Sequence, residues 1–195
     1  MKKKWLWILV FMGMIFIAGL MIGPVMSDVE TPSYRIVQTQ KDIEIRHYEP
    51  MIVANVKVTG DRENTLRKGF QLLADYIFGN NTVVQEISMT APVQQQAMDT
   101  LWEVSFVMPS DYNMVTLPRP NNDSVVIEEI PSEKFVVIIF SGASSNENVE
   151  KYERKLMSYV VRNNILVIGT PKYAFYNPPW TLPQMRRNEI MMKIL

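Results

Sequence analysis

The only histidine in this sequence, His47, is its clearest candidate for chemistry. It lies in the stretch EIRHY, residues 44–48, whose alternating pattern is typical of a strand. A neutral imidazole can ligate haem iron when one ring nitrogen is accessible beside an apolar wall. The same pattern also fits a half-buried histidine bonded to backbone at a strand end. Because a single histidine cannot build a multi-histidine zinc site, we expect any metal at His47 to be haem iron.

A second candidate lies on a predicted helix. Arg67, Phe70 and Ala74 follow one another at spacings of three and four residues, which places them on one side of that helix. An arginine above an apolar stripe can hold a flat, anionic ligand. The plainer interpretation is that the stripe packs on a sheet while the arginine lays its carbon chain along it.

The segment YNPPWTLPQMRRNEIMM, residues 176–192, combines prolines, a tryptophan and paired arginines. Its prolines predict a rigid, extended loop, from which Trp180 offers a flat apolar surface. Arg186 and Arg187 can bind carboxylates, including the propionates of a porphyrin. The alternative is that one of them pairs with Glu189 or another acid of the same domain.

Signals of catalysis are absent from the sequence. It contains no P-loop, G-x-S-x-G, H-E-x-x-H or G-x-G-x-x-G motif. A Ser–His–Asp arrangement through His47 has no marked nucleophile. Glu128 and Glu129 occupy adjacent strand positions, which face opposite ways. We therefore predict no catalytic residue and a protein that is not an enzyme.

Hydrophobic periodicity predicts the elements that position these residues. Apolar residues at helical spacing predict a helix that Asp61 caps and Gly79 ends, and a second helix within residues 146–164. The predicted strands cover residues 34–40, 42–48, 51–58, 82–88, 101–108, 124–130, 134–142, 165–176 and 188–195.

The order strand–strand–helix–strand–strand occurs twice, on either side of a proline-bearing connection at residues 109–123. Laying Gly60 on Gly142 aligns the two halves with an offset of 142 − 60 = 82 residues. We therefore predict an internal duplication, with halves at about 34–109 and 124–195. Packed together, the halves predict an α+β fold in which an eight-stranded sheet closes into a distorted antiparallel barrel with two helices outside.

The first 27 residues read as a membrane-directed segment. Lys2, Lys3 and Lys4 precede an uncharged run at residues 5–23, which is long for a signal peptide and close to a bilayer span. We expect an uncleaved signal anchor, a tether at 28–33 and a domain at 34–195. The lysines should stay cytoplasmic, which places the domain on the periplasmic or extracellular side. The alternative is a signal peptide cleaved after Ser27, which would give a secreted domain.

The charge balance and the cysteine content exclude several kinds of binding partner and covalent attachment. The chain has 20 basic and 20 acidic residues, and removing the three N-terminal lysines leaves 17 against 20, a net charge of −3. No basic field remains to attract nucleic acid, so that partner is not expected. Cysteine is absent, which excludes disulfides, thiolate metal sites and covalent haem attachment.

These motifs together resemble the SOUL haem-binding protein family over roughly residues 34–194. The resemblance rests on YRIVQTQKDIEIRHYEP, ISMTAPV, LRKGFQLLADYIFGNN and YNPPWTLPQMRRNEIMMKI. It implies a duplicated βα unit in a distorted eight-stranded barrel, similar to the effector-binding domains of bacterial multidrug-responsive regulators. It also implies non-covalent binding of haem or another tetrapyrrole, for buffering, transport or sensing.

The resemblance gives the candidate residues their roles. In one branch of the family a histidine is the proposed iron ligand, and this position carries over onto His47. In another, the porphyrin lies on an apolar helix face near a basic residue, which carries over onto Arg67, Phe70 and Ala74. Two alternatives stay open: a module that binds hydrophobic small molecules or envelope partners without haem, and a hydrolase that uses the barrel groove.

Overall fold

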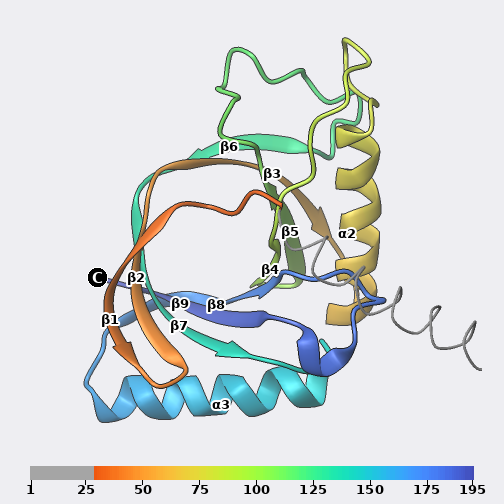
Figure 1. The fold of residues 1–195 in the computed structure, drawn as a ribbon. Helices are drawn as coiled ribbons and strands as arrows, with labels where there is room; N and C mark the ends of the chain where they lie inside the picture. The colour runs from red at the N-terminus through yellow and green to blue at the C-terminus, as the bar shows by residue number, and fades with distance from the viewer. Residues whose placement is uncertain (1–28) are drawn as a thin grey trace, which may run out of the picture.

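The computed structural model describes residues 29–195, which form one curled sheet with helices on its outer side (Figure 1). Its nine strands are antiparallel and lie in the order β1-β2-β7-β9-β8-β4-β5-β3-β6. The strands span Tyr34–Gln40 (β1), Ile43–Tyr48 (β2), Met51–Val58 (β3), Val93–Met98 (β4), Leu101–Val107 (β5), Val126–Ile130 (β6), Glu133–Phe140 (β7), Val167–Phe175 (β8) and Asn188–Ile194 (β9). The helices span Arg62–Ile77 (α2), Asn146–Arg162 (α3) and the short 3-10 helix Pro183–Met185 (η1).

The strand order is symmetric about the β4–β8 pair at its centre. Outwards from that pair, β5, β3 and β6 on one side mirror β9, β7 and β2 on the other. The first strand of each half pairs with the second strand of the other half, β2 with β7 and β6 with β3. This exchange of strands ties the two halves into one sheet.

The predicted closed, eight-stranded barrel is wrong in two respects. β1 adds a ninth strand outside the symmetric set, and the edge strands β1 and β6 do not pair with each other. The physical reason is that both edges of β2 are already paired, one with β1 and one with β7, while β6 pairs with β3 alone. The sheet is therefore curled but open.

The predicted strand at 82–88 is also wrong, and β4 was missed. The buried Asn81 side chain holds this segment as a loop, because its amide donates to the Gln85 carbonyl at 2.7 Å and its oxygen accepts from the Gln85 N–H at 3.0 Å. Val84 takes a left-handed φ of 54° and projects into solvent. The glutamines at 94–96 hid β4, since they break the apolar pattern expected of a strand.

Helix α2 begins and ends where the sequence predicts. The Asn64 N–H donates to the Asp61 carboxylate at 3.0 Å, and the helix ends just before Gly79, whose φ of 111° favours glycine. Leu73 and Ile77 are buried in a core between the helix and strands β3 and β5. Because Leu73 and Ile77 face the core, the opposite side of α2 faces solvent, and we call it the outer side of α2.

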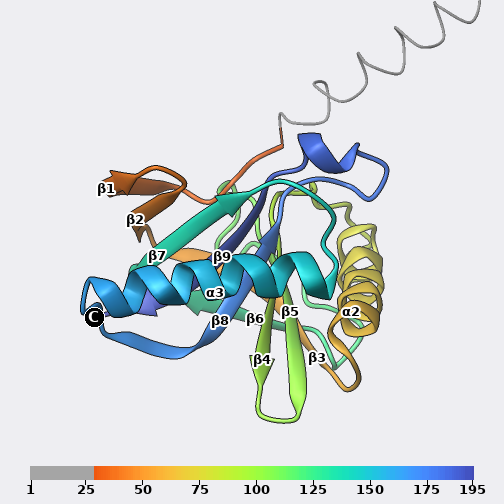
Figure 2. The same cartoon turned by 90° about the horizontal axis from the view of Figure 1, so that it is seen from below.

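Helix α3 covers the other half of the sheet. It lies over β7 and β9, and Figure 2 shows it crossing this part of the sheet. Val149, Leu156 and Tyr159 are buried beneath it, in a second core that also contains Ile43 of β2. The two cores lie on the outer side of the sheet, so the alternating residues of each strand face the concave inner side.

Candidate functional site

His47 lies on β2 and has both ring nitrogens engaged. The Ser132 hydroxyl lies 2.7 Å from Nε2, and Nη2 of Arg35 lies 2.9 Å from Nδ1. Ser132 donates its hydrogen to the Tyr48 carbonyl at 2.8 Å, so its oxygen accepts from Nε2–H of His47. Nδ1 therefore keeps its lone pair and accepts from Arg35.

This hydrogen bonding bears on iron ligation. A histidine that ligates a metal through one ring nitrogen usually donates the other N–H to a carboxylate, carbonyl or water. Here Nδ1 faces the guanidinium of Arg35, which can only donate. Ligation through Nε2 of His47 requires the Ser132 contact to break and the ring proton to move. Iron ligation by His47 stays a prediction, and it requires the loss of the hydrogen bond to Ser132.

Two of the three helix candidates, Arg67 and Phe70, are exposed on α2, and the third, Ala74, is buried. Phe70 is 37% exposed, and its ring meets the buried Phe106 edge-on with centroids 5.4 Å apart. Arg67 is exposed, and within residues 29–195 its guanidinium forms no hydrogen bond or ion pair. Ala74 is buried one turn further along the helix. The exposed ring of Phe70 and the guanidinium of Arg67 are therefore the groups that a ligand on this helix could reach.

The structure does not bring His47 and the α2 residues into one site. β2 lies near one edge of the sheet order, whereas α2 packs on β3 and β5 towards the other edge (Figure 1). One bound ligand therefore cannot touch both groups in this arrangement, and the two predicted binding modes are separate alternatives.

Arg186 and Arg187 of the C-terminal segment bind different partners. Arg187 pairs with Glu189 at 2.6 Å, which is one of the two interpretations that the sequence left open. Arg186 donates to backbone carbonyls of its own loop, to Thr181 at 2.7 Å and to Pro179. Both guanidiniums thus have partners within the loop or the sheet beneath it.

The largest fully buried side chain, Arg46, was not among the residues that the sequence singled out. Its side chain is 0% exposed and donates to both carboxylate oxygens of Glu189, at 2.9 and 3.1 Å. It also donates to Glu44 at 2.6 Å and to the Tyr48 hydroxyl at 2.9 Å. The available signal was strand parity, because Glu44, Arg46 and Tyr48 alternate with the apolar positions of β2 and face the inner side.

Tyrosines complete this buried network. The Tyr176 hydroxyl donates to Glu189 at 3.0 Å, and the Arg46 guanidinium lies 4.3 Å from the centre of the Tyr34 ring. Burial, followed by the Glu189 carboxylate, raises the pKa of both Tyr48 and Tyr176 above the ordinary tyrosine value. The tyrosines are therefore neutral at physiological pH and act as hydrogen-bond partners.

Lys172 is a second charged residue that the sequence did not single out. It projects from β8 on the inner side of the sheet, with its ammonium 5.8 Å from the centre of the Phe135 ring. Burial lowers the pKa of Lys172, although Glu133 and Glu103 act in the opposite direction. Glu133 pairs with Lys193 at 2.5 Å, and within the described residues Lys172 has no ion-pair partner.

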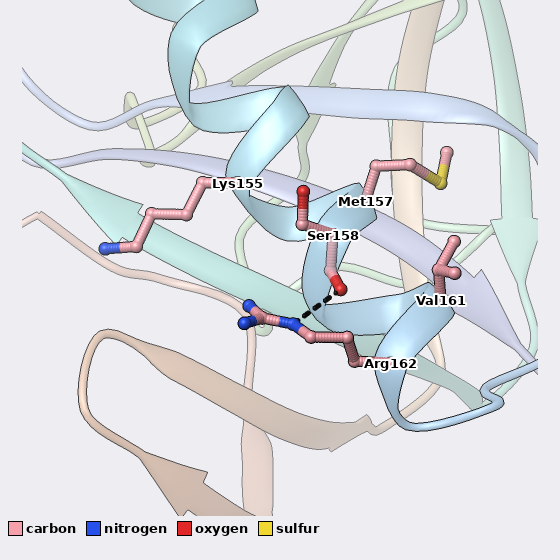
Figure 3. Close-up of a pocket in the computed structure, with 5 residues that line it drawn as sticks. All are labelled: Lys155, Met157, Ser158, Val161 and Arg162. Atoms are coloured by element: carbon pink, nitrogen blue, oxygen red, sulfur yellow. Dashed lines mark hydrogen bonds between the residues drawn. The ribbon is translucent and has the colours of Figure 1, made fainter.

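The outer side of α3 carries an open depression, which Figure 3 shows in close-up. All of its lining side chains come from this one helix: Lys155, Met157, Ser158, Val161 and Arg162. Arg162 donates to the Ser158 carbonyl at 3.0 Å, a contact within the helix. A depression formed by one convex surface encloses no ligand, so we do not assign a site to it.

The described residues offer neither a cluster of metal ligands nor a membrane-spanning helix. Across residues 29–195, no group of three histidine, cysteine or acidic side chains gathers in a way that could hold a metal ion. No helix in that range is both long and apolar enough to cross a membrane. The predicted anchor at residues 5–23 lies outside the described part of the chain.

Comparison with solved structures defines the class of fold. The C-terminal domain of EcmrR superposes with a TM-score of 0.63 at 14% identity, covering 83% of this chain and 98% of that domain. A hydrolase from Listeria innocua superposes with a TM-score of 0.55 at 8% identity, covering 82% and 94%. At these identities the likeness shows the fold alone, an α+β fold like that of the EcmrR C-terminal domain.

Sequence comparison defines the family. The family model described as "SOUL heme-binding protein" matches residues 29–193, and the chain belongs to this family. It is 29% identical over 178 residues to "Heme-binding protein 2" of Homo sapiens, covering 84% of this chain and 85% of the relative. It is 27% identical over 159 residues to the Mus musculus protein of the same name, covering 76% of each. The family and its haem ligand agree with the sequence prediction.

Proposed function

We propose that this chain binds haem or another tetrapyrrole non-covalently, with the porphyrin resting on the outer side of α2. The observation that carries the proposal is the exposed ring of Phe70, backed edge-on by Phe106, in a chain that belongs to a haem-binding family. A flat aromatic ligand gains stacking and apolar contact there. Arg67, which has no partner among the described residues, supplies a cation for a propionate.

His47 provides the alternative position. Its ring must give up the Ser132 contact before Nε2 can bind iron, whereas Phe70 and Arg67 need no rearrangement. We therefore favour α2 and treat ligation by His47 as the competing mode. The competing mode predicts a change in the haem spectrum on removal of His47.

Haemin titration of the full chain, followed at the Soret band, distinguishes the two positions. Phe70→Ala is expected to weaken haemin binding by about tenfold, or ~1.4 kcal/mol. Arg67→Gln is expected to weaken it less, and more at low salt than at high salt. An effect of His47→Ala alone would place the haem on β2.

Matched controls lie on the same helix. Phe78→Ala removes an aromatic ring that is 66% exposed at the end of α2, and Lys68→Gln removes an exposed cation next to Arg67. Both variants are expected to bind haemin like the parent chain. If either control weakens binding as much as its partner variant, the assignment to Phe70 and Arg67 is wrong.

We also propose that the N-terminal segment anchors the domain to a membrane. The uncharged run at residues 5–23 follows three lysines, which supports a single-pass anchor with the domain on the exported side. There the domain would buffer, carry or sense haem. Intact mass of the membrane fraction tests the anchor directly, since cleavage after Ser27 would remove the first 27 residues.

A second candidate function is binding of hydrophobic small molecules without a role for iron. The observation that favours it is the exposed ring of Phe70, which can stack on any flat hydrophobic ligand. This function predicts equal affinity for haemin, metal-free protoporphyrin and an unrelated aromatic cation. The tetrapyrrole proposal predicts that both porphyrins bind and the aromatic cation does not.

A further inference from the structure

The loop between β8 and β9 exposes three large apolar side chains within six residues. We call residues 178–185 the Trp180 loop. Trp180 is 70% exposed, Leu182 49% and Met185 51%. Residues 176–188 also contain two arginines and no acidic residue. The loop is therefore apolar at its tip and has no acidic side chain of its own.

Hydrogen bonds hold these side chains outwards. The Thr181 N–H donates to the Pro178 carbonyl at 3.0 Å, and the Gly142 N–H donates to the Pro183 carbonyl at 2.8 Å. Arg186 stabilises the loop conformation by donating a hydrogen bond to the Thr181 carbonyl. Three prolines further limit the backbone. The apolar tip cannot readily fold back onto the domain, so its exposure is built into the loop.

The loop lies at the end of the molecule where the described chain begins. Figure 2 shows η1 and the start of the described chain at the same end. Arg187, at the base of the loop, donates to the Tyr34 hydroxyl of β1 at 3.3 Å. The chain from the end of the uncharged run at Gly23 to Val29 spans six peptide steps, at most about 20 Å when extended. A bilayer that holds residues 5–23 therefore lies within that distance of this end of the domain.

We propose that the Trp180 loop inserts its tip into the interfacial region of the bilayer that holds residues 5–23. Tryptophan is favoured at headgroup level, where one end of its ring meets apolar chains and the other meets water. Leu182 and Met185 add apolar area next to it, and the absence of acidic residues avoids repulsion from anionic lipids. The inference rests on the anchor part of the proposed function and not on haem binding.

The absence of cysteine permits a site-specific test on the full chain. Leu182→Cys carries an environment-sensitive fluorophore in nanodiscs of phosphatidylcholine and phosphatidylglycerol. Val161→Cys on α3 is the matched control, because Val161 is also an exposed aliphatic residue, 65% exposed. We expect emission from position 182 to shift to shorter wavelength and to be quenched by spin-labelled lipid. We expect emission from position 161 to do neither.

Three outcomes would overturn the inference. These are equal responses at both positions, no response at position 182 in chains that have entered the nanodisc, and failure of the full chain to enter nanodiscs. The last outcome would also remove the anchor, and sedimentation with the nanodiscs identifies it. The Soret titration on the same samples is independent of both labels, so failure of haem binding remains distinguishable from failure of membrane contact.

Discussion

Arg46 and Glu189, 143 positions apart in the chain, form a doubly hydrogen-bonded ion pair in which both side chains are 0% exposed. The pair joins the EIRHY stretch of β2 to the RRNE stretch of β9, two of the motifs on which the family resemblance rests. β7 lies between these strands, so the ion pair spans it on the inner side of the sheet. In this chain, the arginine of EIRHY thus has a clear structural role.

Removing Arg46 alone should be severely destabilising. Arg46→Met takes away one of the two arginine partners of the buried Glu189 and leaves Arg187 as the other. The expected cost is about 3–5 kcal/mol in the free energy of unfolding. The double variant Arg46→Met/Glu189→Leu should recover a large part of this loss, because no unpaired buried charge remains. Urea denaturation of the parent, both single variants and the double variant measures the coupling. Strictly additive losses would show that the pair does not act as a unit.

Alkaline pH should weaken the fold through its buried tyrosines. Burial raises the pKa of Tyr76 to about 12, and burial with Glu189 raises the pKa values of Tyr48 and Tyr176 as well. The unfolded chain releases these protons near pH ~10. The stabilisation is therefore fully present below pH ~10 and is lost as the pH rises through the folded-state pKa values.

Urea denaturation at several pH values from neutral to strongly alkaline measures this loss. Tyr76→Phe supplies the control, because it removes one of the raised pKa values together with the hydrogen bond to Pro118. That variant should be less stable at neutral pH and should lose less stability on going to high pH. A parent chain whose stability stays constant well above pH ~10 would contradict the assignment.

Lys172 should lower the stability of the fold at neutral pH. Its pKa is lowered by burial, so protonation of Lys172 opposes folding until the pH rises towards the ordinary lysine value. Lys172→Met keeps the length of the side chain and removes the charge, and should stabilise the protein by roughly 0.5–2 kcal/mol. Thermal unfolding at neutral pH measures the gain. The exposed Lys57→Met is the control, and an equal gain there would show a general charge effect.

Gly69 should not tolerate the smallest side chain. A Cβ at this buried position of α2 would lie 2.5 Å from Cβ of Val104 on β5. Gly69→Ala should therefore destabilise the protein by about 1–3 kcal/mol, although alanine is the better helix former. Adding Val104→Ala should partly compensate for the overlap at Gly69. If Gly69→Ala alone stabilises the protein, the close contact of α2 with β5 is wrong.

The sequence predicted the helices and strands more reliably than it predicted whether the sheet closes into a barrel. The helices, most strands and the Asp61 cap follow from local periodicity and are confirmed. The open sheet was not predictable from local patterns, because it depends on which distant strands pair, such as β2 with β7 and β3 with β6. The loop at 82–88 was read as a strand because its exposed valines mimic strand composition, while the bonds from Asn81 that hold it are specific to the folded state.

The candidate residues show the same limit. Spacing predicted that Arg67, Phe70 and Ala74 lie on one side of a helix, and all three fall within α2, with Ala74 buried. Parity placed His47 on the same side of β2 as Ile45, but could not show that Arg35 and Ser132 occupy its ring nitrogens. Those contacts depend on which strand lies beside β2 and on the turn before β7. Where residue types alone allow two interpretations, the contacts in the folded structure are therefore needed to assign a binding role.

The most direct test of tetrapyrrole binding on α2 is the Soret-band titration of haemin into the parent chain and Phe70→Ala in parallel. We predict a saturable spectral change at one haemin per chain for the parent, with about tenfold weaker binding for Phe70→Ala. The spectrum of His47→Ala should match that of the parent. Absence of saturable binding by the parent chain would contradict the proposal outright. Equal affinity of the parent and Phe70→Ala would remove α2 as the binding surface.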